Sequence, residues 1–140
     1  NGSAENYYHA GVRAAMLQFS QFPNGRKLYN EYMSEEAINN YLAENPYNAA
    51  DALKQINTQY WITCFCDEYE TFSNWRRSGY PELVYPNLYL NPIPGVNHNL
   101  SRRFTYPDTE SQINTANYEE AVSKLSKGNT FESRVWWDIN

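Results

Sequence analysis

The sequence has few cysteines and few histidines, and this limits the kinds of site it can build. Cys64 and Cys66 are its only 2 cysteines in 140 residues. Placed two apart on a helix, they would point about 200° away from each other. They are therefore badly placed to pair with one another or to hold one metal ion. His9 and His98 lie far apart and have no ligand spacing around them, so we expect neither a metal site nor a disulfide scaffold.

The chain also lacks a surplus of basic residues and a long apolar run. Its 11 Lys and Arg against 16 Asp and Glu give a net charge of −5. This argues against nucleic acid as the main partner, because no basic face dominates. No uninterrupted apolar run is long enough to cross a bilayer, and no signal peptide is visible. Because the chain opens on Asn1 rather than methionine, we expect a processed form or an excerpt of a longer protein.

Aromatic side chains are abundant where aliphatic ones are scarce. They make up 16% of the residues and include 13 tyrosines and 4 tryptophans. Each buried ring removes roughly 150–250 Å² from water, so a core can form with few aliphatic residues. Tyrosine and tryptophan also serve binding surfaces, including surfaces that bind sugars. For any individual ring, a place in the core is the simpler interpretation.

The strongest helical pattern lies between residues 49 and 78. Apolar residues recur there every three or four positions, which is the spacing of one helical face. They are Leu53, Ile56, Tyr60, Cys64, Phe65, Tyr69, Phe72 and Trp75. We predict helices over 49–66 and 67–78 with little or no break, capped by Asn48 and stopped by Gly79. This aromatic pair is the predicted nucleus of the core.

Further helices are predicted on either side of this pair. Ser3 caps one over 3–22, Ser34 caps one over 34–44, and Asn117 caps one over 117–127 that Gly128 closes. Residues 26–33 form a connector of uncertain structure. Short loops between these helices favour antiparallel packing, so the predicted class is mainly α.

Two segments are predicted to be irregular. Residues 80–116 cannot form one regular helix, because prolines interrupt them at 81, 86, 92, 94 and 107. Within this segment, 100–106 is short enough for an extended, strand-like piece. The tail over 128–140 ends with Trp136 and Trp137, and adjacent tryptophans rarely stand at a free terminus unless they dock. We therefore expect the tail to pack onto the rest of the chain.

Charged clusters offer two candidate chemistries, each with a simpler explanation. The acids at 67, 68 and 70 could suggest a glycosidase carboxylate pair, but such pairs usually come from different elements, and these acids share one helix. The arginine pairs at 76–77 and 102–103 could clamp an anion. We interpret them instead as partners of nearby carboxylates and carbonyls. With no phosphate loop, nucleophile elbow or HExxH motif present, an enzyme is not supported.

Several runs of residues, in order along nearly the whole chain, resemble the SusD/RagB family. NYY at 6–8, QYWI at 59–62, WRRSGYP at 75–81, SRRFTYP at 101–107, NY at 117–118 and VWWD at 135–138 are similar to its C-terminal motifs. The sequence departs from them at Cys64, Cys66 and Phe72, which we interpret as core substitutions. The resemblance implies that residues 1–140 are the C-terminal portion of a largely helical fold with tetratricopeptide-like helix pairs.

The resemblance also implies a function. Family members are surface lipoproteins of the outer membrane of Bacteroidetes that capture glycans for a TonB-dependent, SusC-like transporter. The expected partners are a polysaccharide or oligosaccharide, that transporter, and a missing N-terminal part that carries the lipid anchor. Neither a cofactor nor a covalent step is expected. The alternative is a helical interaction fragment with no ligand site of its own.

Residue roles follow from this reading. Tyr85, Asn87, Tyr89 and His98, in the proline-rich loop, are the candidates for glycan contact; the alternative is a loop that packs on the scaffold. The remaining candidates are assigned to the structural core. They are Trp61, Phe72, Trp75, Arg76, Arg77, Arg102, Arg103, Trp136 and Trp137.

Overall fold

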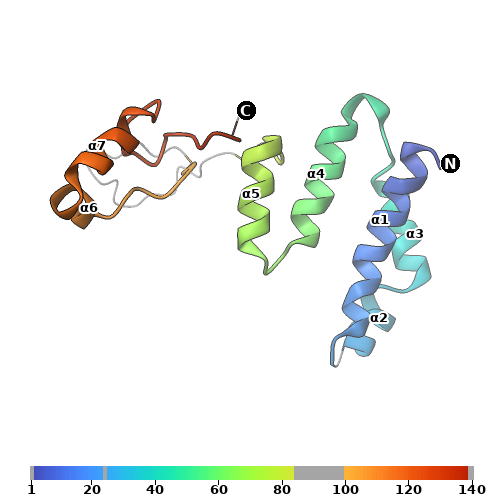
Figure 1. Cartoon of the computed structure of the whole chain (residues 1–140). Coiled ribbons are helices and arrows are strands. Elements are labelled where there is room, and N and C mark those ends of the chain that lie inside the picture. The colour runs from blue at the N-terminus through green and yellow to red at the C-terminus, as the bar shows by residue number, and fades with distance from the viewer. Residues whose placement is uncertain (1, 24, 84–99, 139–140) are drawn as a thin grey trace, which may run out of the picture. The chain divides into compact units, whose positions relative to one another are not determined.

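The computed structural model describes residues 2–23, 25–83 and 100–138, and the described part is mainly helical (Figure 1). The chain divides into two compact units, residues 1–75 and residues 76–140. The boundary falls inside helix α5. A mainly α class was predicted and is confirmed, and no strand occurs in the described residues.

Helix α1 (Ala4–Gln18) organises the first unit. Ser3 caps it as predicted, since its hydroxyl accepts a hydrogen bond from the backbone N–H of Asn6 at 3.2 Å. The helix continues into a 3₁₀ turn over Phe19–Gln21. It lies against helices α3 and α4 (Figure 1), and Tyr8 and Val12 are its buried residues. This helix therefore provides the centre of a small core.

Helices α2 (Gly25–Tyr32) and α3 (Glu35–Glu44) follow. Helix α2 was not predicted, because the sequence suggested only a connector of uncertain structure over residues 26–33. The second begins as predicted, with the Ser34 hydroxyl accepting from the N–H of Ala37 at 3.2 Å. Its Ile38 is fully buried. Arg13 of α1 ion-pairs with Glu35 and so fastens the two helices together at their surface.

Helices α4 (Ala52–Thr63) and α5 (Glu68–Ser78) form the predicted central pair. Asn48 caps the 3₁₀ turn over Ala49–Asp51 that leads into α4. The expectation of an almost unbroken helix is wrong, because Cys64–Asp67 form a turn. Helix α4 ends at Thr63, and Cys66, later in the turn, has a left-handed φ of +74°. Cys64 and Cys66 therefore do not share a helix. The expectation that helix geometry points their side chains away from each other does not apply.

Residues of α4 and α5 link the pair across this turn. The Tyr60 hydroxyl donates to the carboxylate of Glu70 at 3.1 Å, and Asn74 donates to Asn57 at 3.0 Å. The end of α5 matches its prediction, since Gly79 is left-handed at φ +74°. A cis peptide bond joins Tyr80 to Pro81 directly afterwards.

The predicted aromatic core face is only partly buried. Trp75 is 7% exposed and its ring stacks with Phe72, while Trp61 is half-buried. Leu53 is 71% exposed and Tyr69 is 87% exposed. The pattern identified an apolar face correctly, but within this chain no described element covers much of it. Trp75 therefore lies in the core as predicted, whereas the placing of Leu53 and Tyr69 in the core is wrong.

The second unit contains helices α6 (Asp108–Ile113) and α7 (Thr115–Ser123), which contact each other. Helix α6 was missed inside the segment predicted to be irregular. Asn114, not the predicted Asn117, directly precedes α7. Asn117 is a residue of the helix itself, and its side-chain amide donates to Asn114 Oδ1 at 2.6 Å. Residues 100–106, expected to be strand-like, form no strand. Gly128 is left-handed at φ +62°, but α7 ends before it.

Within the described ranges, no helix is both long and apolar enough to cross a membrane.

Candidate functional site

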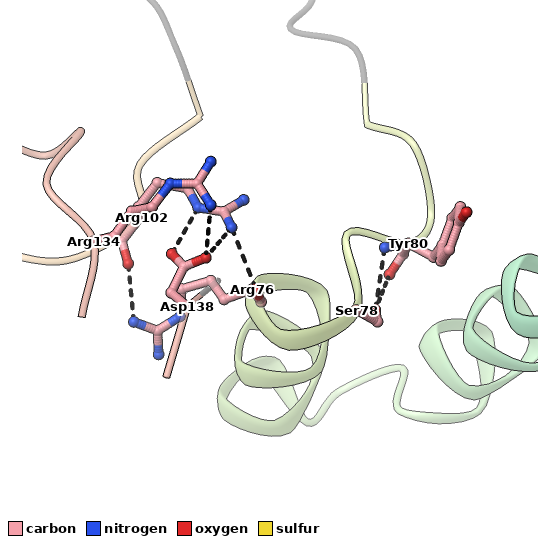
Figure 2. A network of polar contacts seen from close by, with 6 residues as sticks. All are labelled: Arg76, Ser78, Tyr80, Arg102, Arg134 and Asp138. Carbon is pink, nitrogen blue, oxygen red and sulfur yellow. Dashed lines mark hydrogen bonds and ion pairs between the residues drawn. The ribbon is translucent and has the colours of Figure 1, made fainter. Parts of the chain in front are cut away.

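The C-terminal tail is fastened by a buried ion pair. The Asp138 carboxylate is wholly buried and accepts two hydrogen bonds from the Arg102 guanidinium, one of them from Nε at 2.8 Å. Arg134 reaches the same carboxylate at 3.4 Å (Figure 2). A planar guanidinium matches a carboxylate in this paired geometry. The predicted docking of the tail is therefore observed within the second unit.

Arg76 extends this network to the start of the unit. It donates to the backbone carbonyl of Arg102 at 2.9 Å, and Arg102 donates back to the carbonyl of Arg76 at 3.3 Å (Figure 2). Its guanidinium also lies 4.4 Å from the centre of the Trp137 ring, a cation–π contact. Burial lowers the pKa of Arg76, and its neighbour Arg102 lowers it further against the opposing effect of Asp138. These contacts, to carbonyls, a carboxylate and a ring, are of the kind that the predicted structural role of Arg76 and Arg102 requires.

The two tail tryptophans have different environments. Trp137 is half-buried beneath Arg76, but Trp136 is 91% exposed, so its assignment to the core is wrong. The two tryptophans lie in a turn that the Asp138 N–H closes on the Val135 carbonyl at 3.0 Å. Arg77, placed in the core by the sequence reading, is also exposed.

Arg103 and Asn129 build the support for a neighbouring cleft. Arg103 is buried, donates to Asn129 Oδ1 at 3.1 Å and lies 4.7 Å from the centre of the Tyr106 ring. The same amide oxygen accepts from the N–H of Tyr106 at 2.8 Å, and the amide nitrogen donates to the Tyr118 hydroxyl at 3.3 Å. The rings of Tyr106 and Tyr118 pack edge to face, with their centres 6.1 Å apart. Both rings are thus held in place by buried polar contacts.

A cleft of about 360 Å³ opens beside these rings. Its volume lies near the lower end of the range for small-molecule sites, roughly 300–1,000 Å³. Helices α6 and α7 supply its polar side chains. The lining includes Tyr106, Glu110, Asn114, Asn117 and Tyr118.

The polar residues of this cleft form a chain along one side. Asn117 donates to Asn114, and Asn114 donates to the Glu110 carboxylate at 3.2 Å. A primary amide has two N–H donors and an oxygen acceptor, so each asparagine keeps capacity beyond these bonds. Alternating donors and acceptors beside aromatic rings suit vicinal hydroxyls on a neutral ring. We call this surface the tyrosine–asparagine cleft.

Two acids of the cluster at 67–70 make hydrogen bonds within the α4–α5 pair. Asp67 accepts from the N–H of Glu70 at 3.2 Å, as an N-cap does, and Glu70 accepts from Tyr60. Asp67 and Glu68 are exposed. Over the described ranges, no group of three or more His, Cys, Asp or Glu side chains could hold a metal ion.

Comparison with known families decides the relationship. Residues 1–138 match the SusD-like family, described as "Susd and RagB outer membrane lipoprotein". The chain belongs to the SusD-like family. No curated protein matches it.

Solved structures agree with this membership in the SusD-like family. A "chitin-binding protein" is 35% identical with a TM-score of 0.76; the alignment covers 100% of this chain and 29% of that one. A "Bacteroidetes AC2a SusD-like" protein is 29% identical with a TM-score of 0.81, over 99% of this chain and 26% of that one. The chain therefore spans less than a third of the length of these SusD-like relatives.

The sequence-predicted glycan contacts Tyr85, Asn87, Tyr89 and His98 lie outside the described residues. The tyrosine–asparagine cleft was not predicted. Tyr106, Asn117 and Tyr118 fall in the runs at 101–107 and 117–118 that carried the resemblance, and none of the cleft residues was assigned to binding. One signal in the sequence could have indicated this cleft. Asn114 and Asn117 are three residues apart, a spacing that places side chains on one helical face, and two tyrosines lie nearby in the sequence.

Proposed function

We propose that this chain is the C-terminal portion of a cell-surface protein that binds a glycan without cleaving it. The observation that carries the proposal is membership in the SusD-like family over residues 1–138. A relative that is 35% identical over the whole chain is titled a chitin-binding protein, which supports a glycan as the ligand class. The protein is anchored by lipid in the outer membrane and delivers its ligand to a TonB-dependent, SusC-like transporter.

Binding by this chain needs no covalent step. Aromatic rings stack on the apolar faces of sugars, and amide and carboxylate groups hydrogen-bond the hydroxyls. The tyrosine–asparagine cleft offers both kinds of group within about 360 Å³. The loop residues Tyr85, Asn87, Tyr89 and His98 remain proposed as a second set of contacts.

Affinity electrophoresis of the full-length protein through gels that contain single polysaccharides tests this function. We expect retardation by one glycan class, chitin-type polymers among the candidates, and no release of reducing sugar on prolonged incubation. Retardation by no polysaccharide would contradict glycan binding, and release of soluble sugar would contradict the non-catalytic role.

The loop contacts have a separate test in the same gels. The Tyr85→Ala and Tyr89→Ala variants are expected to run with less retardation than the unmodified protein. Unchanged retardation would show that these rings do not contact the glycan.

A further inference from the structure

An apolar groove of about 590 Å³ runs between helices α1 and α4 in the first unit. From α1 it is lined by Tyr7, Gly11 and Ala14, and from α4 by Ile56, Tyr60 and Thr63. Of the described residues that line it, none carries a charge. Tyr7 and Ile56 are exposed, so the groove is open in the described structure.

The side of α1 that faces this groove has unusually small side chains. Gly11 stands in the middle of the helix, where glycine is less stable than alanine. A Cβ atom at Gly11 would meet nothing within 4 Å, so no described element requires a glycine there. Ala14, three residues further along the helix and on the same side of it, is also exposed. Small residues at this spacing let a second helix approach closely, because its side chains fit into the space they leave.

The polar groups that α4 contributes to the groove are already engaged, which argues against a sugar. The Gln59 amide pairs with the Tyr41 hydroxyl at 2.8 to 3.0 Å. The Thr63 hydroxyl donates to the carbonyl of Gln59 at 2.8 Å, and the Tyr60 hydroxyl donates to Glu70. A sugar placed here would find few partners for its hydroxyls, and burying them without partners is costly.

We propose that this groove is occupied by an amphipathic helix from the part of the same polypeptide that lies outside these 140 residues. Solved relatives are long enough to supply it, since this chain aligns with only 29% and 26% of theirs. The apolar lining requires an apolar partner surface, and exposed patches of this kind on soluble proteins mark interaction sites. The inference does not depend on which ligand the protein binds.

The Gly11→Ala variant of the full-length protein tests the close approach. In an open groove, alanine raises the melting temperature because it favours the helix and meets no atom. Under a packed helix, the added methyl group lacks space, and we expect the melting temperature to fall by at least about 2 °C. The control is Asn40→Ala, an exposed α3 position where alanine is expected to raise it slightly. A rise for Gly11→Ala comparable to that of the control overturns the proposal.

Cysteine labelling identifies the occupant, and it does not depend on the stability of the glycine variant. Cys64 and Cys66 are first replaced by serine, and Ala14→Cys is compared with Ala43→Cys, an exposed position of α3 outside the groove. We expect a maleimide to label position 14 at least about tenfold more slowly than position 43 at every protein concentration. Equal rates overturn the proposal. Protection that appears only at high concentration assigns the groove to a second copy, and protection that requires the transporter assigns it to that partner; either result also overturns it.

Discussion

Asp138 is the residue on which the order of the C-terminal tail depends most. Its side chain is fully buried and faces Arg102, whose own side chain is 13% exposed. A carboxylate removed from water needs a charged, hydrogen-bonded partner to offset the loss of hydration. The tail is therefore held by a polar contact, where the sequence reading expected both tryptophans to hold it.

Replacing Asp138 by Asn removes the charge and keeps the size. Because Arg102 would then be buried without its carboxylate, we expect a loss of about 3–5 kcal/mol in the free energy of unfolding. Urea denaturation of the full-length protein measures the change. Lys124→Ala is the matched control, since it breaks an exposed pair with Glu120 and should cost less than about 1 kcal/mol. Equal effects of the two variants would contradict a buried, stabilising pair.

Tyr60 makes a pH-dependent contribution at the alkaline end. Although the ring is partly exposed, desolvation of its hydroxyl, followed by the hydrogen bond to Glu70, raises the pKa of Tyr60 to about 12 from the ordinary 10.0. The folded chain holds this proton more tightly than the unfolded chain does. The resulting stabilisation is complete below pH 10 and is lost as the pH rises toward 12.

We therefore expect Tyr60→Phe to reduce the steepness with which stability falls between pH 10 and 12. Thermal melts at several alkaline pH values provide the measurement. Tyr69→Phe, which removes an exposed phenol from α5, is the control and should leave the slope unchanged. An unchanged slope for Tyr60→Phe as well would rule out its contribution.

At the scale of elements, the turn between α4 and α5 carries backbone strain at Cys66. Its φ of +74° is unfavourable for a residue with a side chain and favourable for glycine. We expect Cys66→Gly to stabilise the protein by about 0.5–1 kcal/mol, measured by urea denaturation. Cys64→Gly is the matched control, because its φ of −80° gives glycine no advantage and the substitution should destabilise. Destabilisation by both would contradict the assigned turn.

Helix ends were predictable where a side chain caps them and not where the backbone alone begins the helix. Ser3 and Ser34 accept the expected N–H bonds, and Gly79 takes the expected left-handed conformation. Helix α2 was missed because it is short and begins at a glycine, a residue that more often marks a break than a helix start. At α7, the predicted cap Asn117 lies inside the helix, and Asn114, which directly precedes the helix, makes no side-chain capping hydrogen bond. The helix therefore begins without the side-chain signal on which the prediction relied.

At the scale of the whole molecule, the sequence identified apolar faces but could not say what covers them. Leu53 and Tyr60 share a face with helical spacing, as predicted, yet both are exposed in this chain. Burial is decided by a partner surface, and periodicity reports only which side chains point the same way. The proposed helix in the α1–α4 groove would cover Tyr60, which lines that groove, but not Leu53, which does not.

The candidate site could be anticipated only in part. A structural role was predicted for the arginines at 76 and 102, and their guanidinium groups bond a carbonyl and a carboxylate of the same unit. The sequence alone did not predict the tyrosine–asparagine cleft. It depends on Asn129, 23 residues after Tyr106, holding both tyrosines in place.

The central claim, that this part of the protein helps to bind a glycan and does not cleave it, is tested most directly by one calorimetric comparison. The full-length protein is titrated with soluble oligosaccharides of whichever polysaccharide retards it most, and the sugars are analysed afterwards. We expect Asn117→Ala to weaken binding about tenfold, Asn40→Ala to leave it unchanged, and the oligosaccharides to keep their length. Unaltered affinity in Asn117→Ala, or shortened oligosaccharides after the titration, would contradict the account.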